Sequence, residues 1–403
     1  MNISFLGGAD EVGASSILLE IGGRRLLIDA GIRPSPKTHW DLAGDQLPDL
    51  SQIERAGGID AILVTHAHTD HTGALALVCE RYPQAPIYAT PMTIELTRVL
   101  QQDARRIMQA RLEEEGELPL FDDVAVSRLL AAFVPVAFRQ RVSLAPGLVA
   151  TFFPAGHIAG AAMIGLESDE GRVLITGDIS ISPQRTVDGA RPPAFAPDVV
   201  IIESTYGGRL HANRAAEERR LVATVNEVIA TGGKVLIPAF ALGRAQEILL
   251  TLAEFQRRAE LPPIPIWADG MVRAVCRAYA RFPEALPTAL QARDAQFLMK
   301  KPFVSLSAAR SATSFSGSQS RLSSWRVLAC WPGGRRCTTH AAWRGSRSMP
   351  SCSPATRTKN RPDAVCRKSP RADTVSCSCD RTGWRCAAGS QPMPCPRTPM
   401  KRS

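Results

Sequence analysis

The chain has 403 residues, which allows roughly two to three domains, each large enough to bury a core. A hydrophobic content of 45% with 21% charged residues excludes a small disulfide-stapled module, and no apolar run approaches the ~18 residues that span a bilayer. Because neither a signal peptide nor a membrane helix is visible, we expect a cytoplasmic protein without a membrane partner.

Charge and composition change sharply near residue 300. The formal net charge is +10, but residues 301–403 hold 19 Lys and Arg against 3 Asp, whereas residues 1–300 hold 29 against 35 Asp and Glu. The same tail contains eight of the ten cysteines and four of the six tryptophans, and it lacks isoleucine and glutamate. Disordered basic arms are usually poor in Cys and Trp, so this composition indicates a different origin for the tail.

Residues 1–300 alternate between strand and helix patterns. Short apolar runs bounded by turn residues predict strands at 3–6, 16–21, 25–29, 61–65, 87–89, 149–153, 173–176 and 199–203. A mixed-charge segment at 93–115 predicts a long helix that closes over a site. Further along, helices at 215–230 and 243–259 flank a strand at 234–238. This βαβα pattern predicts an inserted α/β segment with a parallel sheet.

The strongest chemical signal directly follows the strand at 61–65. Residues 65–71 read Thr-His-Ala-His-Thr-Asp-His, so three histidines and an aspartate share six positions. His66 and His68 can project toward one metal because alternate residues share a face, while the turn directs Asp70 and His71 toward a second. A polar loop with unrelated histidines is the alternative, but four ligand-type residues in one loop favour metal binding.

Two further candidate ligands lie at strand ends downstream. His157 follows Gly156, and Asp178 follows Gly177. Glycines let the backbone approach a buried site closely, and metal coordination would offset the cost of burying the Asp178 carboxylate. Taken alone, His157 fits a satisfied loop histidine better than a metal ligand, but beside the histidine loop at 66–71 metal binding is favoured. Asp29, at the end of an earlier strand, is expected to orient the histidine loop.

In this order, these residues resemble the metallo-β-lactamase superfamily. The resemblance implies an αββα sandwich and two zinc ions. His66, His68 and His157 would bind one zinc, Asp70 and His71 would bind the other, and Asp178 would bridge them. A hydroxide held between the metals would be the nucleophile, because zinc lowers the pKa of bound water to about 7.

The sequence beyond Asp178 resembles the β-CASP branch of nucleic-acid nucleases within this superfamily. Glu203, in the segment 201–207, falls on that branch's first extra acidic motif, and residues 238–247 resemble the strand-to-helix joint of its cap domain. Residues 8–15 resemble the cleavage-and-polyadenylation nuclease subunit and its prokaryotic relatives. Simple packing, capping or turn roles are the alternative for each piece. The resemblance implies RNA as substrate, with Asp29, Asp178 and Glu203 completing the catalytic set.

The family's two later histidine motifs are absent from the chain as written, so the second zinc site is expected to be incomplete. Read in another frame, residues 327–342, 352–367 and 392–401 can encode segments similar to the family's sequences. Three such stretches in one frame and in order predict an out-of-frame translation from about residue 304. The tail's cysteines then need not be zinc ligands or form disulfides.

The predicted organisation is a metallo-β-lactamase domain at 1–195, an incomplete β-CASP cap at 196–303 and an out-of-frame, unstructured tail at 304–403. The predicted function is dizinc hydrolysis of RNA phosphodiester bonds, with little or no activity in this particular chain. Two alternative hypotheses are a small-molecule hydrolase that uses the same metals and a non-catalytic RNA-binding subunit. The sequence does not indicate an oligomeric state.

Overall fold

A computed structural model of the chain describes residues 1–33, 46–291, 303–304, 325–328, 377–380 and 383–386. By internal contacts the chain divides into two compact units, Met1–Cys337 and Thr338–Ser403. In the described parts, every helix is too short or too polar to cross a bilayer.

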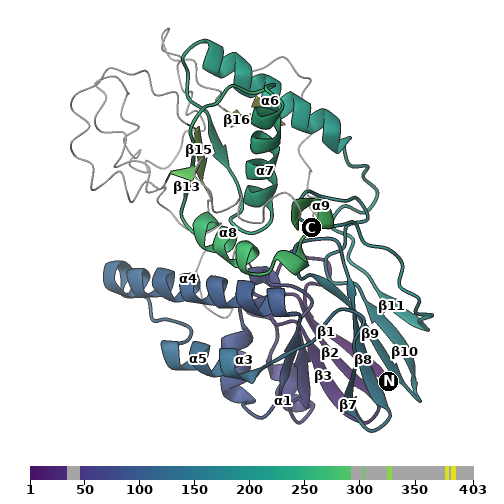
Figure 1. Cartoon of the computed structure of the whole chain (residues 1–403). Coiled ribbons are helices and arrows are strands. Elements are labelled where there is room, and N and C mark those ends of the chain that lie inside the picture. Colours follow the sequence, from purple (N-terminus) through teal and green to yellow (C-terminus); the bar gives the residue numbers. More distant parts are fainter. Residues whose placement is uncertain (34–45, 292–302, 305–324, 329–376, 381–382, 387–403) are drawn as a thin grey trace, which may run out of the picture. The chain divides into compact units, whose positions relative to one another are not determined.

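The first unit contains a six-stranded sheet with the order β1-β2-β3-β4-β5-β6 (Figure 1). The pairs β1/β2 and β2/β3 are antiparallel, and the remaining pairs are parallel. Its strands are β1 (Asn2–Gly7), β2 (Ser16–Ile21), β3 (Arg24–Ile28), β4 (Ala61–Leu63), β5 (Ile87–Ala89) and β6 (Phe133–Pro135). All five strands predicted before residue 100 are therefore confirmed.

A second, five-stranded sheet has the order β11-β10-β9-β8-β7. Its neighbours are antiparallel except β10 and β11, which run parallel. The strands are β7 (Arg141–Ala145), β8 (Leu148–Pro154), β9 (Ala162–Ser168), β10 (Gly171–Ile175) and β11 (Val199–Ile201). Because β11 belongs to this sheet, the sheet continues past residue 195, where the sequence places the start of the cap.

Side-chain alternation along β3 explains why the two sheets pack face to face. Leu26 and Ile28 lie in a buried cluster together with Phe152 and Ile164 of the second sheet. Leu27 points to the opposite face of β3 and lies in a different cluster. Each sheet thus contributes one apolar face to a shared core, the sandwich expected for the metallo-β-lactamase fold.

Helices cover the outer face of the six-stranded sheet. The cluster of Leu27 includes Ile53, Val78 and Leu129, one from each of three helices. These helices are α1 (Ser51–Arg55), α3 (Leu75–Arg81) and α5 (Asp123–Ala132). The long helix predicted at 93–115 is α4 (Pro91–Glu115), and the four-residue α2 (Thr69–Thr72) follows the histidine loop.

The inserted segment forms a parallel sheet with the order β12-β15-β13-β14, as the βαβα pattern predicts. Its strands are β12 (Leu236–Pro238), β13 (Ile266–Asp269), β14 (Phe303–Val304) and β15 (Trp325–Leu328). Its helices are α6 (Arg214–Ala230), α7 (Arg244–Arg257), α8 (Val272–Arg281), the short 3-10 turn η2 (Pro283–Ala285) and α9 (Thr288–Gln291).

Regular structure also occurs inside the segment 304–403, which the sequence predicts to be unstructured. Strand β15 lies between β12 and β13, and the second unit contains an antiparallel hairpin of β16 (Cys377–Asp380) and β17 (Gly383–Cys386). The expectation of no regular structure is thus wrong for these short strands, because main-chain ladder hydrogen bonds do not require a particular side-chain pattern. The segments proposed to be out of frame otherwise lie outside the described residues.

Candidate metal centre

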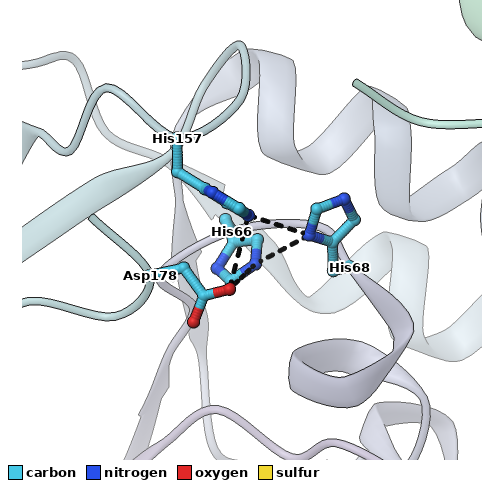
Figure 2. A group of neighbouring side chains, drawn as sticks. All are labelled: His66, His68, His157 and Asp178. Carbon is cyan, nitrogen blue, oxygen red and sulfur yellow. Dashed lines mark hydrogen bonds and ion pairs between the residues drawn. The ribbon is translucent and has the colours of Figure 1, made fainter. Parts of the chain in front are cut away.

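Three strand ends bring the predicted ligands together at one edge of the sandwich. His66 and His68 follow β4, His157 follows β8, and Asp178 follows β10. Figure 2 shows the four side chains converging. Nε2 of His66 and Nε2 of His157 each lie 3.1 Å from Nδ1 of His68. Residues from both sheets therefore build one cluster.

The Asp178 carboxylate completes this cluster. Its Oδ2 atom lies 3.4 Å from Nε2 of His157 and 3.8 Å from Nε2 of His66. One ligand atom from each of the four residues, His68 included, lies within 4.8 Å of all the others. This spacing allows a single metal ion to contact all four residues.

The glycine before His157 is needed for the close approach that the sequence predicts. Gly156 has a φ of +70°, and a Cβ atom at this position would lie 2.3 Å from the carbonyl oxygen of Ser180 and 2.3 Å from the amide nitrogen of Ala190. Any larger residue would push the His157 loop away from the loop that follows β10. The ligand loops therefore pack backbone against backbone.

His71 faces the other oxygen of Asp178. Nε2 of His71 lies 3.3 Å from Oδ1 of Asp178 and 4.0 Å from Oδ2 of Asp70. The two oxygens of Asp178 thus face different groups, since Oδ2 faces His66 and His157. Asp70 and His71 lie beside the four-residue cluster and not within it.

Asp29 connects the histidine loop to the end of β3. Its carboxylate is 4% exposed, and Oδ1 accepts a hydrogen bond from the amide of Thr65 at 2.7 Å. Oδ2 accepts a hydrogen bond from Oγ1 of Thr65 at 2.6 Å and lies 2.7 Å from Nδ1 of His71. Oγ1 of Thr65 also lies 3.1 Å from Nδ1 of His66. Thr65, to which the sequence assigns no role, therefore joins Asp29 to two of the histidines.

Burial and neighbouring charges divide the histidines into two protonation classes. Burial, with the nearby imidazoles, holds the pKa of His66 well below its usual range and lowers the pKa of His157 to about 4. Burial likewise lowers the pKa of His68, although Asp70 and Asp178 oppose this effect. These three imidazoles are neutral at pH 7, which is the form that binds metals.

The carboxylate and the fourth histidine carry the complementary charges. Burial raises the pKa of Asp178, but the hydrogen bond from His71 and the electrostatic effect of the surrounding imidazoles outweigh burial and hold this pKa well below its usual range. Burial opposes protonation of His71, yet Asp29 and Asp178 hold its pKa well above the usual range. Three neutral imidazole nitrogens and one carboxylate oxygen form a donor set that fits a zinc-type ion.

Glu203 lies next to the Asp178 loop. Its Oε1 atom accepts a hydrogen bond from the amide of Ile179 at 3.4 Å, and its Oε2 atom accepts one from Thr205 at 2.8 Å. Glu203 lies two residues after the end of β11, and helix α6 begins only at Arg214. The alternative that Glu203 is the N-terminal carboxylate of a helix is therefore wrong.

Two contacts to the ligand loops have no clear signal in the sequence. Nε2 of Gln184 donates hydrogen bonds to the carbonyl oxygens of His157 at 2.7 Å and Gly156 at 3.3 Å. The backbone of Leu242, just before α7, lies close enough to the His68 ring to raise its pKa. The sequence predicts the joint at 238–247 but not its contact with a metal ligand, because that contact is made only in the folded chain.

Comparison with known proteins agrees with this architecture. A family model described as "Metallo-beta-lactamase superfamily" matches residues 9–239, more than half of the chain. Transcription termination factor FttA of Pyrococcus horikoshii is 33% identical over 304 residues, which cover 72% of this chain and 45% of that protein. Endoribonuclease YSH1 of Mycosarcoma maydis is 34% identical over 310 residues, 74% of this chain and 34% of that protein.

Integrator complex subunit 11 of Danio rerio is 32% identical over 288 residues, 70% of this chain and 47% of that protein. The chain thus spans about a third to a half of the length of these relatives. A crystal structure of a protein of unknown function from Enterococcus faecalis V583 aligns with a TM-score of 0.47 and 13% identity over 81% of this chain and 76% of that chain. That score adds nothing to the assignment.

The fold and the histidine cluster define a protein of the metallo-β-lactamase class. The chain belongs to the metallo-β-lactamase superfamily, in its β-CASP branch. The resemblance seen in the sequence is confirmed.

Proposed function

We propose that this chain derives from a zinc-dependent hydrolase that cleaves RNA phosphodiester bonds. The observation that carries the proposal is the cluster of His66, His68, His157 and Asp178 at the strand ends of a β-CASP metallo-β-lactamase fold. The name of one relative, an endoribonuclease, supports RNA as the substrate. A cytoplasmic location remains a prediction.

We assign the first zinc to these four residues and a second to Asp70 and His71, with Asp178 shared between the two. Bound zinc would supply a Lewis acid that activates water for attack on phosphorus. Within the protein, Asp29 holds Nδ1 of His71, so that Nε2 of the same ring faces Asp178. Glu203 holds the amide that follows Asp178 and thereby steadies this carboxylate.

We also propose the division into a metallo-β-lactamase domain, an incomplete cap and an out-of-frame tail. The alignments to the three relatives support this division, because they leave 26–30% of the chain unmatched. The proposed tail at 304–403 makes up a similar share, about a quarter of the chain. In its original reading frame, the DNA of this segment would have encoded the later histidine motifs of the family. The chain as written is therefore expected to show little or no nuclease activity.

The test uses a frame-restored protein and a labelled single-stranded RNA. His68→Ala and Asp178→Asn should each slow single-turnover cleavage by at least ~100-fold, because the metals supply several kcal/mol of transition-state stabilisation. RNA binding should change little, since phosphate contacts position the strand independently of the chemistry. His211→Ala is the matched control, because this exposed histidine contacts the Tyr206 ring outside the cluster.

Three results would contradict the proposal in different ways. Rapid cleavage by His68→Ala or Asp178→Asn would show that these residues are not the metal ligands of the reaction. Hydrolysis of a β-lactam without RNA cleavage would favour the small-molecule hydrolase. RNA binding without cleavage by the frame-restored protein would favour the non-catalytic RNA-binding subunit.

A further inference from the structure

Glu247 is a buried carboxylate whose hydrogen bonds go to the loop after Asp178 and to α6. It is 4% exposed and lies in the first turn of α7. Its Oε1 atom accepts hydrogen bonds from the amide of Thr186 at 2.7 Å and from Oγ1 of Thr186 at 2.6 Å. Its Oε2 atom accepts hydrogen bonds from the amide of Arg185 at 2.8 Å and from Nη1 of Arg214 at 3.1 Å. Four donors around one buried carboxylate hold the loop at 184–186 against α7.

The same loop holds the backbone of a predicted metal ligand. Gln184 precedes the two residues bound by Glu247, and its Nε2 atom donates to the carbonyl oxygens of His157 and Gly156. Its Oε1 atom accepts a hydrogen bond from Nη2 of Arg214 at 3.3 Å. Arg214 thus contacts Glu247 and Gln184 with the two ends of one guanidinium group. A continuous set of hydrogen bonds therefore runs from α7 to the His157 loop.

The start of α7 meets the ligand loops a second time. Gly243, the N-cap of α7, has a φ of +82°, and a Cβ atom there would lie 2.9 Å from Cγ2 of Ile158. The preceding residue, Leu242, is the one whose backbone contacts the His68 ring. Gly243 and Glu247 are four residues apart, so they lie on the same face of the helix. The residues at the start of α7 therefore lie against two of the three loops that carry predicted metal ligands.

We propose that Glu247 and Gln184 are positioning residues that set the His157 loop and couple the position of α7 to metal affinity. This inference rests on the metal-binding function proposed above. Coupling of this kind is reciprocal, so metal binding should stabilise α7 against local opening as much as α7 favours metal binding. A substrate that contacts the cap would act on the metal centre by this route.

The experiment measures metal binding by the full 403-residue chain with zinc or cobalt alone. Glu247→Gln keeps the shape but replaces one acceptor oxygen with a donor that faces other donors. Gln184→Met keeps the length but removes the hydrogen bonds to His157 and Gly156. Zinc affinity, from competition with a chromophoric chelator, should fall by about 10-fold or more in each variant, as for other groups that orient metal ligands. The visible absorption of bound Co²⁺ should shift in both variants.

Glu254→Gln is the matched control for charge and for stability. Glu254 lies near the other end of α7 and pairs with Arg257 at 2.7 Å and with Arg258 at 2.8 Å, away from the loop at 184–186. It should lower the melting temperature while leaving zinc affinity and the Co²⁺ spectrum unchanged. Gln184 is only half-buried, so Gln184→Met remains informative even if Glu247→Gln fails to fold.

Coupling predicts that the double variant Glu247→Gln/Gln184→Met loses less affinity than the product of the two single losses. Wild-type affinity and an unchanged Co²⁺ spectrum in Gln184→Met would overturn the inference while leaving the metal site in place. An equal loss of affinity in Glu247→Gln and Glu254→Gln would also overturn it, because charge alone would then explain the effect. Absence of metal binding by the wild-type chain would overturn both the inference and the proposed function.

Discussion

Nδ1 of His71 lies 2.7 Å from Oδ2 of Asp29, and both side chains are almost fully buried. Such a pair orients the imidazole and keeps it charged until a metal displaces the proton from the opposite nitrogen. Asp29, directly after β3, therefore orients a histidine that lies 42 residues later in the sequence.

Asp29→Asn should weaken binding at the Asp70 and His71 site by about 10- to 100-fold, because the imidazole loses its orienting carboxylate. The variant should also lose about 1–3 kcal/mol of unfolding free energy, since the amide cannot accept all the hydrogen bonds that the carboxylate receives. Zinc titration and denaturant unfolding measure the two effects. Asp60→Asn is the control. Asp60 accepts a hydrogen bond from the amide of Arg25, but it lies just before the start of β4, at the end of the strand opposite to the histidine loop. Equal zinc affinities in the two variants would contradict the prediction.

The chain as written should hold one zinc ion tightly and a second weakly. His66, His68, His157 and Asp178 form a four-residue set, whereas the site of Asp70 and His71 lacks the histidine expected from later in the family's sequence. Metal analysis after dialysis should give an occupancy nearer one than two. Two equally tight ions, or none, would argue against this assignment.

Metal binding should release protons in an order set by the pKa shifts. The pKa values of His66, His68 and His157 are lowered, so at pH 7 these rings are neutral and lose no proton when the first metal binds. The pKa of His71 is raised, so this ring is protonated at pH 7 and releases about one proton when the second metal binds. Calorimetry in buffers of different ionisation enthalpy counts these protons. Release of a proton with the first metal would show that the order is wrong.

Consequently, affinity for the first metal should change little between pH 8 and pH 6, whereas affinity for the second should fall as the pH is lowered. Protons compete for His71 throughout this range because its pKa lies above the usual value. Asp29→Asn should reduce this pH dependence, since the carboxylate is the group that favours the charged ring. An unchanged pH dependence in that variant would exclude Asp29 as the cause.

Phe152→Ala should remove about 3–5 kcal/mol of unfolding free energy from the sandwich domain. Phe152 is fully buried in the core between the two sheets, so the substitution leaves a cavity that the rigid sheets cannot fill. Phe240→Ala, at a ring that is 63% exposed, is the control and should cost far less. Denaturant unfolding followed by circular dichroism compares the two.

DNA sequencing across codons 295–315 should reveal an insertion or deletion that shifts the reading frame. A frame-restored chain should then contain the later histidine motifs and bind two zinc ions with similar affinity. An unshifted reading frame, confirmed in the messenger RNA, would make the basic tail an encoded part of the protein and would refute the frameshift.

The sequence alone determined the sandwich class, through its resemblance to the family, and it predicted the four candidate ligands that the folded chain brings together after three strands. Strong local signals made this possible: β3 is followed directly by Asp29, Thr65 lies two residues after β4, and residues 66–71 concentrate ligand-type side chains. Local spacing also predicted the helix over 91–115 to within two residues at its start. Strands such as β9 and β13 were not predicted.

Only the tertiary structure decided which oxygen of Asp178 faces which histidine, and which side chains hold the loops of the candidate ligands in place. The assignment of Asp178 oxygens to different histidines depends on where β10 lies relative to β4, and these strands belong to different sheets. The contacts from Gln184 to His157 and from Glu247 to Thr186 join residues 27 and 61 positions apart. Gln184 carries no motif signal, and the motif at 238–247 includes Glu247 without indicating its partner, because the hydrogen-bonding partner of a buried polar group is selected by packing and not by its neighbours in the chain.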